Sequence, residues 1–284
     1  MTVWEALRQG GRLLSQVSEE AELDAELLLR HCVGLDRSGI YRRLAEQMSD
    51  EQERRYGAVV GRRLVHEPTA YILGHKEFFG LDFEVTLAAI IPRPETELLV
   101  ELAINFARLR TAGPPPAIAD IGTGCGAIAV SIAHTLPDVH VIATDVSADA
   151  LALAGRNAER HGVSDRIDFR CGDLLAPLDA PADLLVANLP YVRTGDWLAL
   201  PPEIRDHEPR AALDGGNDGL RVIERLLQQA PACLRTSGAL LAEIGDEQGD
   251  EASAMAQEVF TNAAIEVRPD LSGRDRVLVV DSLG

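Results

Sequence analysis

The chain has 284 residues, of which 46% are hydrophobic and 25% charged, a composition typical of a folded protein and not of a disordered one. Its formal charge of −18 repels phosphate backbones, which disfavours free DNA or RNA as a partner. No apolar run approaches the ~18 residues that a membrane span needs. Residues 1–5 lack the basic and then apolar pattern of a signal peptide. We therefore expect a cytoplasmic protein without a membrane partner.

Cysteine spacing and charge distribution narrow the possible class of protein further. The cysteines are widely scattered and form no Cys-x-x-Cys pair, which argues against zinc sites and disulfide frameworks. We predict small buried thiols and no metal site. Residues 1–80 hold 11 Lys and Arg against 13 Asp and Glu, whereas residues 81–284 hold 16 against 32. The cysteines are Cys32, Cys125, Cys171 and Cys233.

The length is comfortable for two domains, and the first part, from Trp4 to about Ala70, has a helical pattern broken by short loops. An amphipathic helix is expected around residues 21–28, with its acidic side chains pointing outward. Another helix is expected to begin at Asp50, and its paired arginines are assigned to solvent in preference to an acidic partner. The acidic side chains are Glu22, Asp24 and Glu26, and the arginine pairs are Arg54-Arg55 and Arg62-Arg63. Residues 1–70 are thus predicted to be a small helical bundle that docks the substrate.

The pattern changes at residues 71–93, where aromatic and β-branched residues with Gly80 predict a hairpin-like connector. A helix is predicted from Pro94 to about Leu109, because proline in the first turn followed by carboxylates is typical of a helix start. Residues 111–116 contain one glycine and three prolines and predict a stiff break before the next element.

Strands and helices alternate from residue 117 onward, a pattern that predicts a parallel-rich, doubly wound α/β sheet. The strands are expected over residues 117–121, 139–144, 167–170, 184–187, 239–244 and 276–280. The helices are expected over residues 127–135, 148–161, 220–234 and 247–260.

A glycine-rich turn follows the first of these strands. Gly122, Gly124 and Gly126 allow the backbone to turn tightly and to approach a ligand without a side chain in the way. Thr123 and Cys125 stand between them, so the spacing is Gly-x-Gly-x-Gly and not the Gly-x-Gly-x-x-Gly of dinucleotide sites. The turn alone is weak evidence, and its ligand need not carry a pyrophosphate.

Acidic residues stand at the ends of successive strands, where open α/β sheets bind ligands. Asp145, at the end of the second strand, can bind a ribose diol. Asp173, beyond the third strand, can accept a hydrogen bond from the exocyclic amine of an adenine, and the side chain of Leu174 can cover the face of that base. Asp120 lies near the position where the amino-acid end of such a ligand would bind. Singly, each aspartate is more often a cap or a solvated loop residue. Together with the glycine turn they describe a site for S-adenosylmethionine.

The segment 183–187 is an apolar run that predicts a buried strand, and Asn188-Leu189-Pro190-Tyr191 follows it directly. An amide, a proline and an aromatic ring therefore lie at the carboxyl edge of the predicted sheet. Such a group can bind both hydrogens of a planar amide or amine and present its nitrogen to a methyl donor.

Together with this motif, the glycine turn and the strand-end aspartates resemble the site of class I methyltransferases that modify amide or exocyclic amine nitrogens. In those enzymes the motif is usually Asn-Pro-Pro-Tyr. Over nearly its whole length the chain is similar to the HemK-type N5-glutamine methyltransferases of peptide chain release factors. The matching stretches are residues 71–74 with 77–78, 91–97, 120–129, 157–158, 188–191, 208–213, 215–216 and 218–220.

The resemblance implies a Rossmann-like, seven-stranded, mostly parallel sheet preceded by a small helical bundle and a β-hairpin connector. The expected domains are residues 1–70, 71–93 and 94–284. The implied reaction is methylation of the glutamine N5 in the Gly-Gly-Gln motif of release factors, with S-adenosylmethionine converted to S-adenosylhomocysteine. We expect a monomer whose partner is the release factor, without direct DNA binding.

The resemblance also implies roles within the site. The Asn188 side-chain oxygen and the Leu189 main-chain carbonyl would accept the two amide hydrogens, Pro190 would stiffen the turn, and Tyr191 would pack on the amide plane. Leu189 stands where the family normally has proline. Leucine keeps the carbonyl and loses the fixed φ, so a modest effect on rate is expected. The expected cofactor-binding residues are Gly122, Thr123, Gly124, Cys125, Gly126, Asp145, Asp173, Leu174 and Asn188.

Several neighbouring residues have two interpretations. In the family, the methyl donor would be covered by Arg93, Glu95 and Thr96. Helix capping would also explain the presence of these three residues. For Glu208 and Arg210 a structural ion pair is favoured over contact with the substrate, and a structural or solvent role is favoured for the loop histidine, His207. The alternative functions are an adenine-N6 nucleic-acid methyltransferase, which the acidic second part disfavours, and a non-catalytic S-adenosylmethionine-binding protein.

Overall fold

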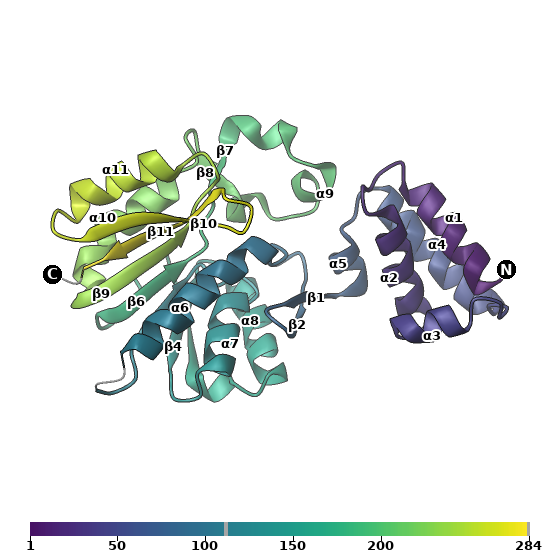
Figure 1. Ribbon diagram of the computed structural model, residues 1–284, viewed down its shortest axis with the longest axis horizontal. Helices are drawn as coiled ribbons and strands as arrows, with labels where there is room; N and C mark the ends of the chain where they lie inside the picture. The colour runs from purple at the N-terminus through teal and green to yellow at the C-terminus, as the bar shows by residue number, and fades with distance from the viewer. Residues whose placement is uncertain (111–112, 283–284) are drawn as a thin grey trace. The chain divides into compact units, whose positions relative to one another are not determined.

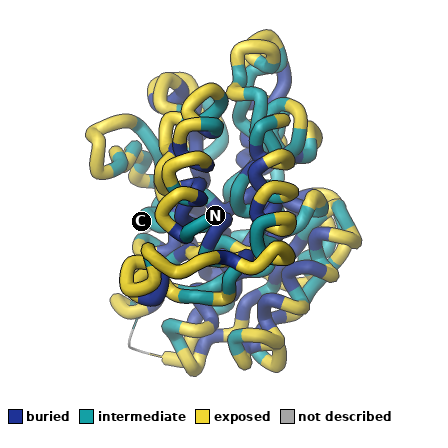
Figure 2. The backbone as a smooth tube through the Cα atoms, turned by 90° about the vertical axis from the view of Figure 1, so that its right-hand side faces the viewer, coloured by how far each residue is buried: buried dark blue, intermediate teal, exposed yellow. Residues whose placement is uncertain are grey.

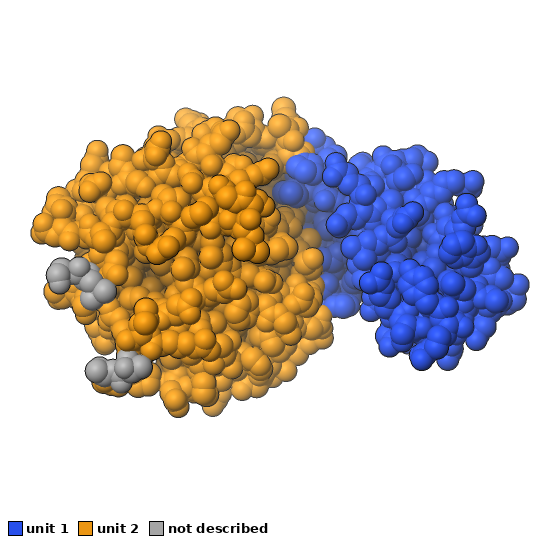
Figure 3. Space-filling view, in the orientation of Figure 1, with its two compact units in different colours: residues 1–75, 201–207 blue, residues 76–200, 208–284 orange. Residues whose placement is uncertain are grey.

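The computed structural model describes residues 1–110 and 113–282, so the predicted break at residues 111–116 begins outside the described residues. The chain forms two compact units, shown in Figure 3. The first consists of Met1–His75 together with Pro201–His207, and the second of Lys76–Leu200 together with Glu208–Gly284. The first unit therefore includes a segment from far along the chain that no local sequence pattern indicates.

Residues 1–75 of the first unit form five helices (Figure 1), and each long one buries one face and exposes the other (Figure 2). Capping boxes fix where two helices begin, at Thr2 for α1 and at Ser49 for α4. Gly34 adopts a left-handed conformation at the end of α2, as glycine commonly does after a helix. The helices are α1 (Val3–Leu14), α2 (Ala21–Val33), α3 (Arg37–Arg42), α4 (Asp50–Leu64) and α5 (Thr69–Leu73).

The prediction for the charged faces of α2 and α4 was wrong at three residues. Asp24, Glu26 and Arg63 are buried. Arg63 donates from Nε to Asp24 at 2.9 Å and from a terminal nitrogen to Glu203 at 2.7 Å. Thr69 Oγ1 also donates to Asp24 at 2.6 Å. Helical periodicity could not reveal this cluster, because one carboxylate lies 140 positions away along the chain.

We expect Arg63→Ala to lower the free energy of unfolding of the first unit by about 3–5 kcal/mol, because it leaves the Asp24 carboxylate buried without its cation. Arg54→Ala is the matched control, since Arg54 forms an exposed pair with Glu51 one turn away, and such pairs contribute under about 1 kcal/mol. Chemical denaturation followed by circular dichroism measures both. Equal losses in the two variants would contradict the buried ion pair.

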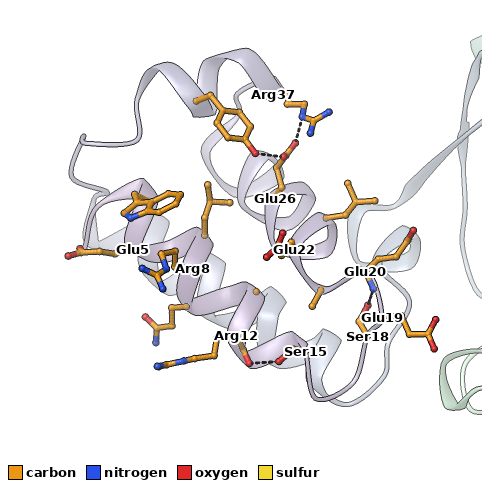
Figure 4. A pocket seen from close by; sticks show the side chains of 17 residues that line it. Glu5, Arg8, Arg12, Ser15, Ser18, Glu19, Glu20, Glu22, Glu26 and Arg37 are labelled. Atoms are coloured by element: carbon orange, nitrogen blue, oxygen red, sulfur yellow. Dashed lines mark hydrogen bonds and ion pairs between the residues drawn. The ribbon is translucent and has the colours of Figure 1, made fainter.

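A wide hollow on the surface of the helical unit lies between α1, α2 and α3 (Figure 4). Three large side chains around it are about half exposed: Trp4 (50%), Leu23 (44%) and Tyr41 (50%). The buried carboxylate of Glu26 lies at its edge, where it accepts a hydrogen bond from Tyr41 at 3.0 Å and faces Arg37 at 3.3 Å. The hollow thus combines exposed aromatic surface with polar groups at fixed positions.

A hairpin of β1 (His75–Phe78) and β2 (Leu81–Glu84) starts at the last residue of the first segment and continues into the second unit. It is followed by a short 3-10 turn (Pro94–Thr96) and α6 (Glu97–Leu109). The remaining helices are α7 (Ala127–Thr135), α8 (Ala148–Arg160), α9 (Pro202–Arg205, in the first unit), α10 (Arg221–Cys233) and α11 (Gly249–Val259). The remaining strands are β3 (Ile118–Ile121), β4 (Val141–Asp145), β5 (Ile167–Cys171), β6 (Ala182–Ala187), β7 (Val192–Arg193), β8 (Asp214–Gly216), β9 (Leu234–Glu243), β10 (Ala264–Pro269) and β11 (Asp275–Asp281).

The main sheet has the order β10-β11-β9-β6-β3-β4-β5. The strands β9, β6, β3, β4 and β5 run parallel, while β11 is antiparallel to both β9 and β10. The expected seven-stranded, mostly parallel sheet is therefore confirmed. The sequence pattern did not identify β10, because its residues alternate between exposed and half-buried and include no buried position.

Alternate residues of the central strands enter two separate cores. Ile118 of β3 and Leu184 of β6 belong to the core that also contains apolar residues of α6, α7 and α8. Ala119 and Leu185, the next residue on each strand, belong to the core formed with α10 and α11. Helices thus cover both faces of the sheet (Figure 1), which explains why these strands have apolar residues on both faces.

The prediction that the cysteines are buried is correct for Cys32 and Cys125 and wrong for Cys171, which is exposed. Cys233 is only partly buried. Cys171 ends β5, which is the edge strand of the sheet, so no further strand covers it.

Candidate active site

The candidate residues meet at the carboxyl edge of the parallel strands. The glycine turn follows β3, Asp145 ends β4, and Asn188 follows β6, which lies beside β3 in the sheet. The register pairs Ile121 of β3 with Ala187 of β6 and with Thr144 of β4. Parallel pairing therefore brings Ile121 beside Ala187, although the two residues lie more than 60 positions apart in the sequence.

The glycine turn is bonded to the end of β4. The main-chain nitrogens of Gly122 and Thr123 donate to the Thr144 carbonyl at 2.8 and 2.9 Å. Gly122 has φ of +75°, and a Cβ there would lie 2.9 Å from Leu189 Cδ2. Gly124 has φ of +57°, and a Cβ there would have no atom closer than 3.7 Å among its non-neighbouring residues. Gly122 is therefore needed for packing, while Gly124 faces more open space.

Asp145 is positioned by main-chain donors. Its Oδ2 accepts from Gly124 N at 2.9 Å, and its Oδ1 accepts from Ser147 N at 2.8 Å. Each carboxylate oxygen has a second lone pair free for another donor. The carboxylate is thereby fixed beside the glycine turn with acceptor capacity remaining.

Asp120 is fully buried directly before the turn. Its Oδ2 accepts from Thr123 Oγ1 at 2.6 Å and from Ala129 N at 3.1 Å, whereas Oδ1 has no hydrogen-bond partner. Burial raises the pKa of this carboxyl to about 7, against the opposing effect of the two hydrogen bonds, and nearby Asp145 raises it slightly further. A buried acceptor without a donor is costly, and an ammonium group would satisfy it.

Three other expected cofactor residues have different surroundings. Asp173 is exposed and forms an ion pair with Arg225 of α10. Leu174 has φ of +49° and is buried in the core shared with α10 and α11. Cys125 is also buried, and burial raises the pKa of its thiol to about 12. The structure therefore brings Asp145 to the glycine turn by hydrogen bonds, while Asp173 bonds to a neighbouring helix.

The Asn188 side chain is bonded to the start of α6. Its Nδ2 donates to Thr96 Oγ1 at 3.0 Å. This bond uses one of the two amide hydrogens, so the side chain retains its second hydrogen and the acceptor oxygen Oδ1. Leu189, next along the chain, is 5% exposed and its side chain packs on Gly122.

We expect Leu189→Pro to change kcat by less than about threefold, because the Leu189 main-chain carbonyl, the expected acceptor, is retained. The loss of packing against Gly122 is expected to lower the free energy of unfolding by about 1–3 kcal/mol. Steady-state kinetics and chemical denaturation measure the two effects separately. A loss of kcat beyond about tenfold would show that this loop follows a geometry different from that of proline-containing relatives.

Tyr191 is anchored at both its side chain and its main chain. Its hydroxyl donates to Glu243 Oε1 at 3.2 Å, and its carbonyl accepts from Gln248 Nε2 at 3.0 Å. Burial, followed by the charge of Glu243, raises the pKa of the hydroxyl, which is neutral and able to donate. Neither Glu243 nor Gln248 was predicted as a site residue, since each stands at the end of an ordinary apolar strand or in the loop after it.

Two glycines further along the chain allow close approach to the same motif. A Cβ on Gly215 would lie 2.6 Å from the Pro190 carbonyl oxygen, and one on Gly219 would lie 2.3 Å from that of Tyr191. Strands β7 and β8 pair beside them. This explains the Gly-rich stretch at residues 215–219, which supports the backbone of the motif.

The remaining charged residues form structural contacts. Glu208 is buried, pairs with Arg93 and accepts from Ile91 N at 3.3 Å. Arg210 donates to Asp214 at 3.0 Å. His207 is partly buried and belongs to the first unit, where its Nε2 lies 3.3 Å from the Val65 carbonyl oxygen.

The described part of the chain has neither a cluster of metal-binding side chains nor a membrane-spanning helix. Residues 1–110 and 113–282 contain no group of three or more His, Cys, Asp or Glu side chains that could bind a metal ion. Within the same ranges, no helix is long and apolar enough to cross a membrane.

Solved methyltransferase structures share the fold of this chain. The catalytic domain of hMettl16, solved with an RNA hairpin, superposes with a TM-score of 0.56 at 16% identity, covering 80% of this chain and 82% of that one. A methyltransferase from Pyrococcus furiosus gives 0.52 at 17% identity, with 73% and 91% covered. At these identities the likeness concerns the fold alone. Residues 100–199 also match the family model described as methyltransferase small domain. The fold and the strand-end site define a class I S-adenosylmethionine-dependent methyltransferase.

Full-length relatives identify the family. The chain is 42% identical over 278 residues to the release factor glutamine methyltransferase of Moorella thermoacetica, covering 97% of each chain. It is 41% identical to that of Bradyrhizobium diazoefficiens (94% and 90% covered) and 44% identical to that of Geobacter sulfurreducens (86% and 84% covered). Residues 5–74 match the model described as PrmC N-terminal domain. The chain belongs to the release factor glutamine methyltransferases.

Proposed function

We propose that this protein transfers a methyl group from S-adenosylmethionine to the side-chain amide nitrogen of the glutamine in the Gly-Gly-Gln motif of peptide chain release factors. The names of its relatives support this substrate. The observation that carries the chemistry is the hydrogen bond from Asn188 Nδ2 to Thr96. It leaves the Asn188 oxygen as an acceptor at the strand edge where a substrate amide would bind.

The residues around the glycine turn fit the cofactor. Asp145 would bind the ribose hydroxyls with the lone pairs that Gly124 and Ser147 leave free. The buried Asp120 carboxylate would lie toward the ammonium end, because its Oδ1 has no partner in the protein. Asp173 would bind the adenine amine after exchanging its exposed contact with Arg225, and such a contact contributes little free energy. When bound, the cofactor supplies an electrophilic methyl group.

The protein would activate the nucleophile by orientation. A carboxamide nitrogen is a weak nucleophile because its lone pair is delocalised into the carbonyl. Two fixed acceptors, Asn188 Oδ1 and the Leu189 carbonyl, would orient the two N–H groups and stabilise the positive charge that develops on nitrogen. Tyr191 would pack against the amide plane. No general base is needed before transfer, because the methylated nitrogen is acidic enough to lose its proton afterwards.

We assign docking of the release factor to the helical unit, and in particular to the hollow with Trp4, Leu23 and Tyr41 (Figure 4). Half-exposed aromatic side chains of this kind are typical anchors of protein interfaces. The protein would act as a cytoplasmic monomer without direct DNA binding.

Replacing both Trp4 and Tyr41 with alanine is expected to raise KM for a full-length release factor by about tenfold or more, since buried aromatic anchors contribute about 2 kcal/mol or more each. KM for a short Gly-Gly-Gln peptide and kcat should change less than about twofold. Leu271→Ala, at a fully exposed leucine of the second unit, is the control. An unchanged KM for the full-length factor would exclude the hollow as its docking surface.

The proposal is tested by incubating the protein with S-adenosylmethionine labelled in its methyl group and a release factor. Label is expected on the Gly-Gly-Gln glutamine and absent from a factor in which that glutamine is replaced by glutamate. Label on DNA or RNA adenine without label on the glutamine would favour the alternative adenine-N6 reaction. Cofactor binding without any transfer would favour a non-catalytic binding protein.

A further inference from the structure

Gln248 stands at the N-cap of α11, in the loop after β9, and its side chain does not cap that helix. A residue at this position usually accepts a hydrogen bond from the first turn of the helix through a side-chain oxygen. Gln248 is only 4% exposed. Because a buried amide is costly unless its polar atoms have partners, its contacts with other parts of the chain indicate what it does.

The Gln248 amide bonds to the main chain of three separate segments. Its Nε2 donates to the carbonyl of Tyr191 at 3.0 Å and to that of Asp218 at 3.2 Å. Its Oε1 accepts from Gly245 N at 2.8 Å. An amide has two donor hydrogens and one acceptor oxygen, so only one orientation of the side chain satisfies two carbonyls and one N–H. Gln248 therefore joins the end of the Asn188–Tyr191 motif to two other loops.

Gly219 makes room for this contact. It has φ of +82°, and a Cβ there would lie 2.3 Å from the Tyr191 carbonyl oxygen and 2.4 Å from Gln248 Nε2. Glycine alone combines an easy positive φ with the absence of a Cβ. A buried amide and a glycine, from two different segments, thus meet at the same carbonyl oxygen.

Two residues of the motif cannot fix its backbone by themselves. Pro190 has no N–H to donate, and Leu189 lacks the fixed φ of proline. The Leu189 carbonyl, the proposed acceptor for the substrate amide, lies two residues before the carbonyl that Gln248 binds. A hydrogen bond at Tyr191 therefore restricts the stretch of backbone that orients this acceptor.

We propose that Gln248 is a positioning residue for methyl transfer: by binding the Tyr191 carbonyl, it holds the backbone of the motif so that the Leu189 carbonyl faces the substrate amide. Gly219 permits the contact, and the bonds to Asp218 and Gly245 fix the Gln248 amide itself. This inference rests on the proposed function, because the orientation of the Leu189 carbonyl matters only where it accepts from the substrate.

The kinetic test uses two substitutions of similar size. Gln248→Glu replaces the donor nitrogen with an oxygen that faces two carbonyl oxygens, and Gln248→Met removes the polar atoms altogether. Both should lower kcat by about 10- to 100-fold, the scale expected when a group at the reacting centre is misplaced by about 1 Å. The Kd of S-adenosylmethionine should change less than about threefold, since Asp120 and Asp145 bond to other residues. Gln257→Glu and Gln257→Met, at an exposed glutamine of α11, are the matched controls and should leave both quantities unchanged.

A merely structural role of Gln248 predicts that kcat falls only as far as stability does. Leu227→Ala, in the core formed with α10 and α11, is the stability control, because removing a buried leucine side chain leaves a destabilising cavity. It should lower the melting temperature at least as far as the Gln248 variants while kcat, measured well below the transition, stays within about twofold of wild type. A kcat within about twofold of wild type for both Gln248 variants, or a cofactor affinity that falls as far as kcat, would overturn the proposal.

The leucine of the motif provides a second test. Proline fixes φ at its own position, so Leu189→Pro should raise the kcat of Gln248→Met by about fivefold or more, although it changes that of the wild type by less than about threefold. The difference between the two backgrounds measures how far the residues act through one another. Gly219→Ala, which crowds the same Tyr191 carbonyl, should lower kcat and respond to proline in the same way. An absence of recovery in both variants would contradict the positioning role.

Hydrogen exchange tests the anchoring of the motif without reference to activity. In Gln248→Met, the main-chain amides of residues 191–193 should exchange faster than in the wild type, because the bond that restrains this backbone is lost. Those of the glycine turn, residues 122–126, should be unchanged. Mass spectrometry of peptic peptides measures both. Unchanged exchange at residues 191–193 would overturn the proposal. A wild type that fails to methylate release factor glutamine but shows this exchange difference would disprove the proposed function and leave the anchoring role of Gln248 intact.

Discussion

Replacing Asn188 with alanine is expected to lower kcat by about 100- to 1,000-fold, the cost of removing one preorganised hydrogen-bonding group from a transition state. The reason is that the amide oxygen is the one side-chain acceptor proposed for the substrate nitrogen. It is oriented by the bond to Thr96. The Kd of S-adenosylmethionine should change less than about threefold, because the bonds that fix Asp145 involve Gly124 and Ser147 and not Asn188.

Single-turnover kinetics and isothermal titration calorimetry separate these two effects. Asn262→Ala is the matched control, since Asn262 is exposed in the loop after α11, and it should leave both quantities unchanged. If cofactor affinity fell as far as the rate, Asn188 would act chiefly in binding the donor, and the assigned role would be wrong.

Asp120→Asn is expected to stabilise the unliganded protein and to weaken cofactor binding. Burial raises the pKa of this carboxyl to about 7, from its ordinary value of 3.8. Between these values the unfolded chain loses a proton that the folded protein keeps, so the free energy of unfolding falls as pH rises through this window. The full destabilisation, about 4 kcal/mol, is present above pH 7. Asparagine removes it and can still accept from Thr123.

Thermal denaturation at pH 5 and pH 8 measures the first effect, and the gain in melting temperature should be larger at pH 8. Cofactor affinity should fall by about tenfold or more for S-adenosylmethionine, because its ammonium group loses a buried carboxylate. The Kd of 5′-methylthioadenosine, which has no amino-acid end, should stay the same. Equal losses for both ligands would show that Asp120 does not face the ammonium group.

Local patterns determined much of the fold. Short segments rich in apolar or β-branched residues predicted β3, β4 and β6, and alternating residues predicted β5. The helix α7 begins and ends at the predicted residues, 127 and 135. Buried parallel strands and amphipathic helices have short periods, which a sequence displays directly. The antiparallel β11 was found as a strand, but its direction depends on β10, whose half-exposed residues give no such pattern.

The sequence by itself also determined the chemical groups of the site: the glycine turn, the strand-end aspartates and the Asn188–Tyr191 motif. Only the tertiary structure decided which partners orient them. Thr96 bonds to Asn188 across 92 positions, and Glu203 bonds to Arg63 across 140. Periodicity reports whether a residue faces inward, but a hydrogen bond depends on where two distant side chains end. For that reason the sequence predicted Asn188 as the acceptor, and the fold decided which of its atoms bonds to Thr96.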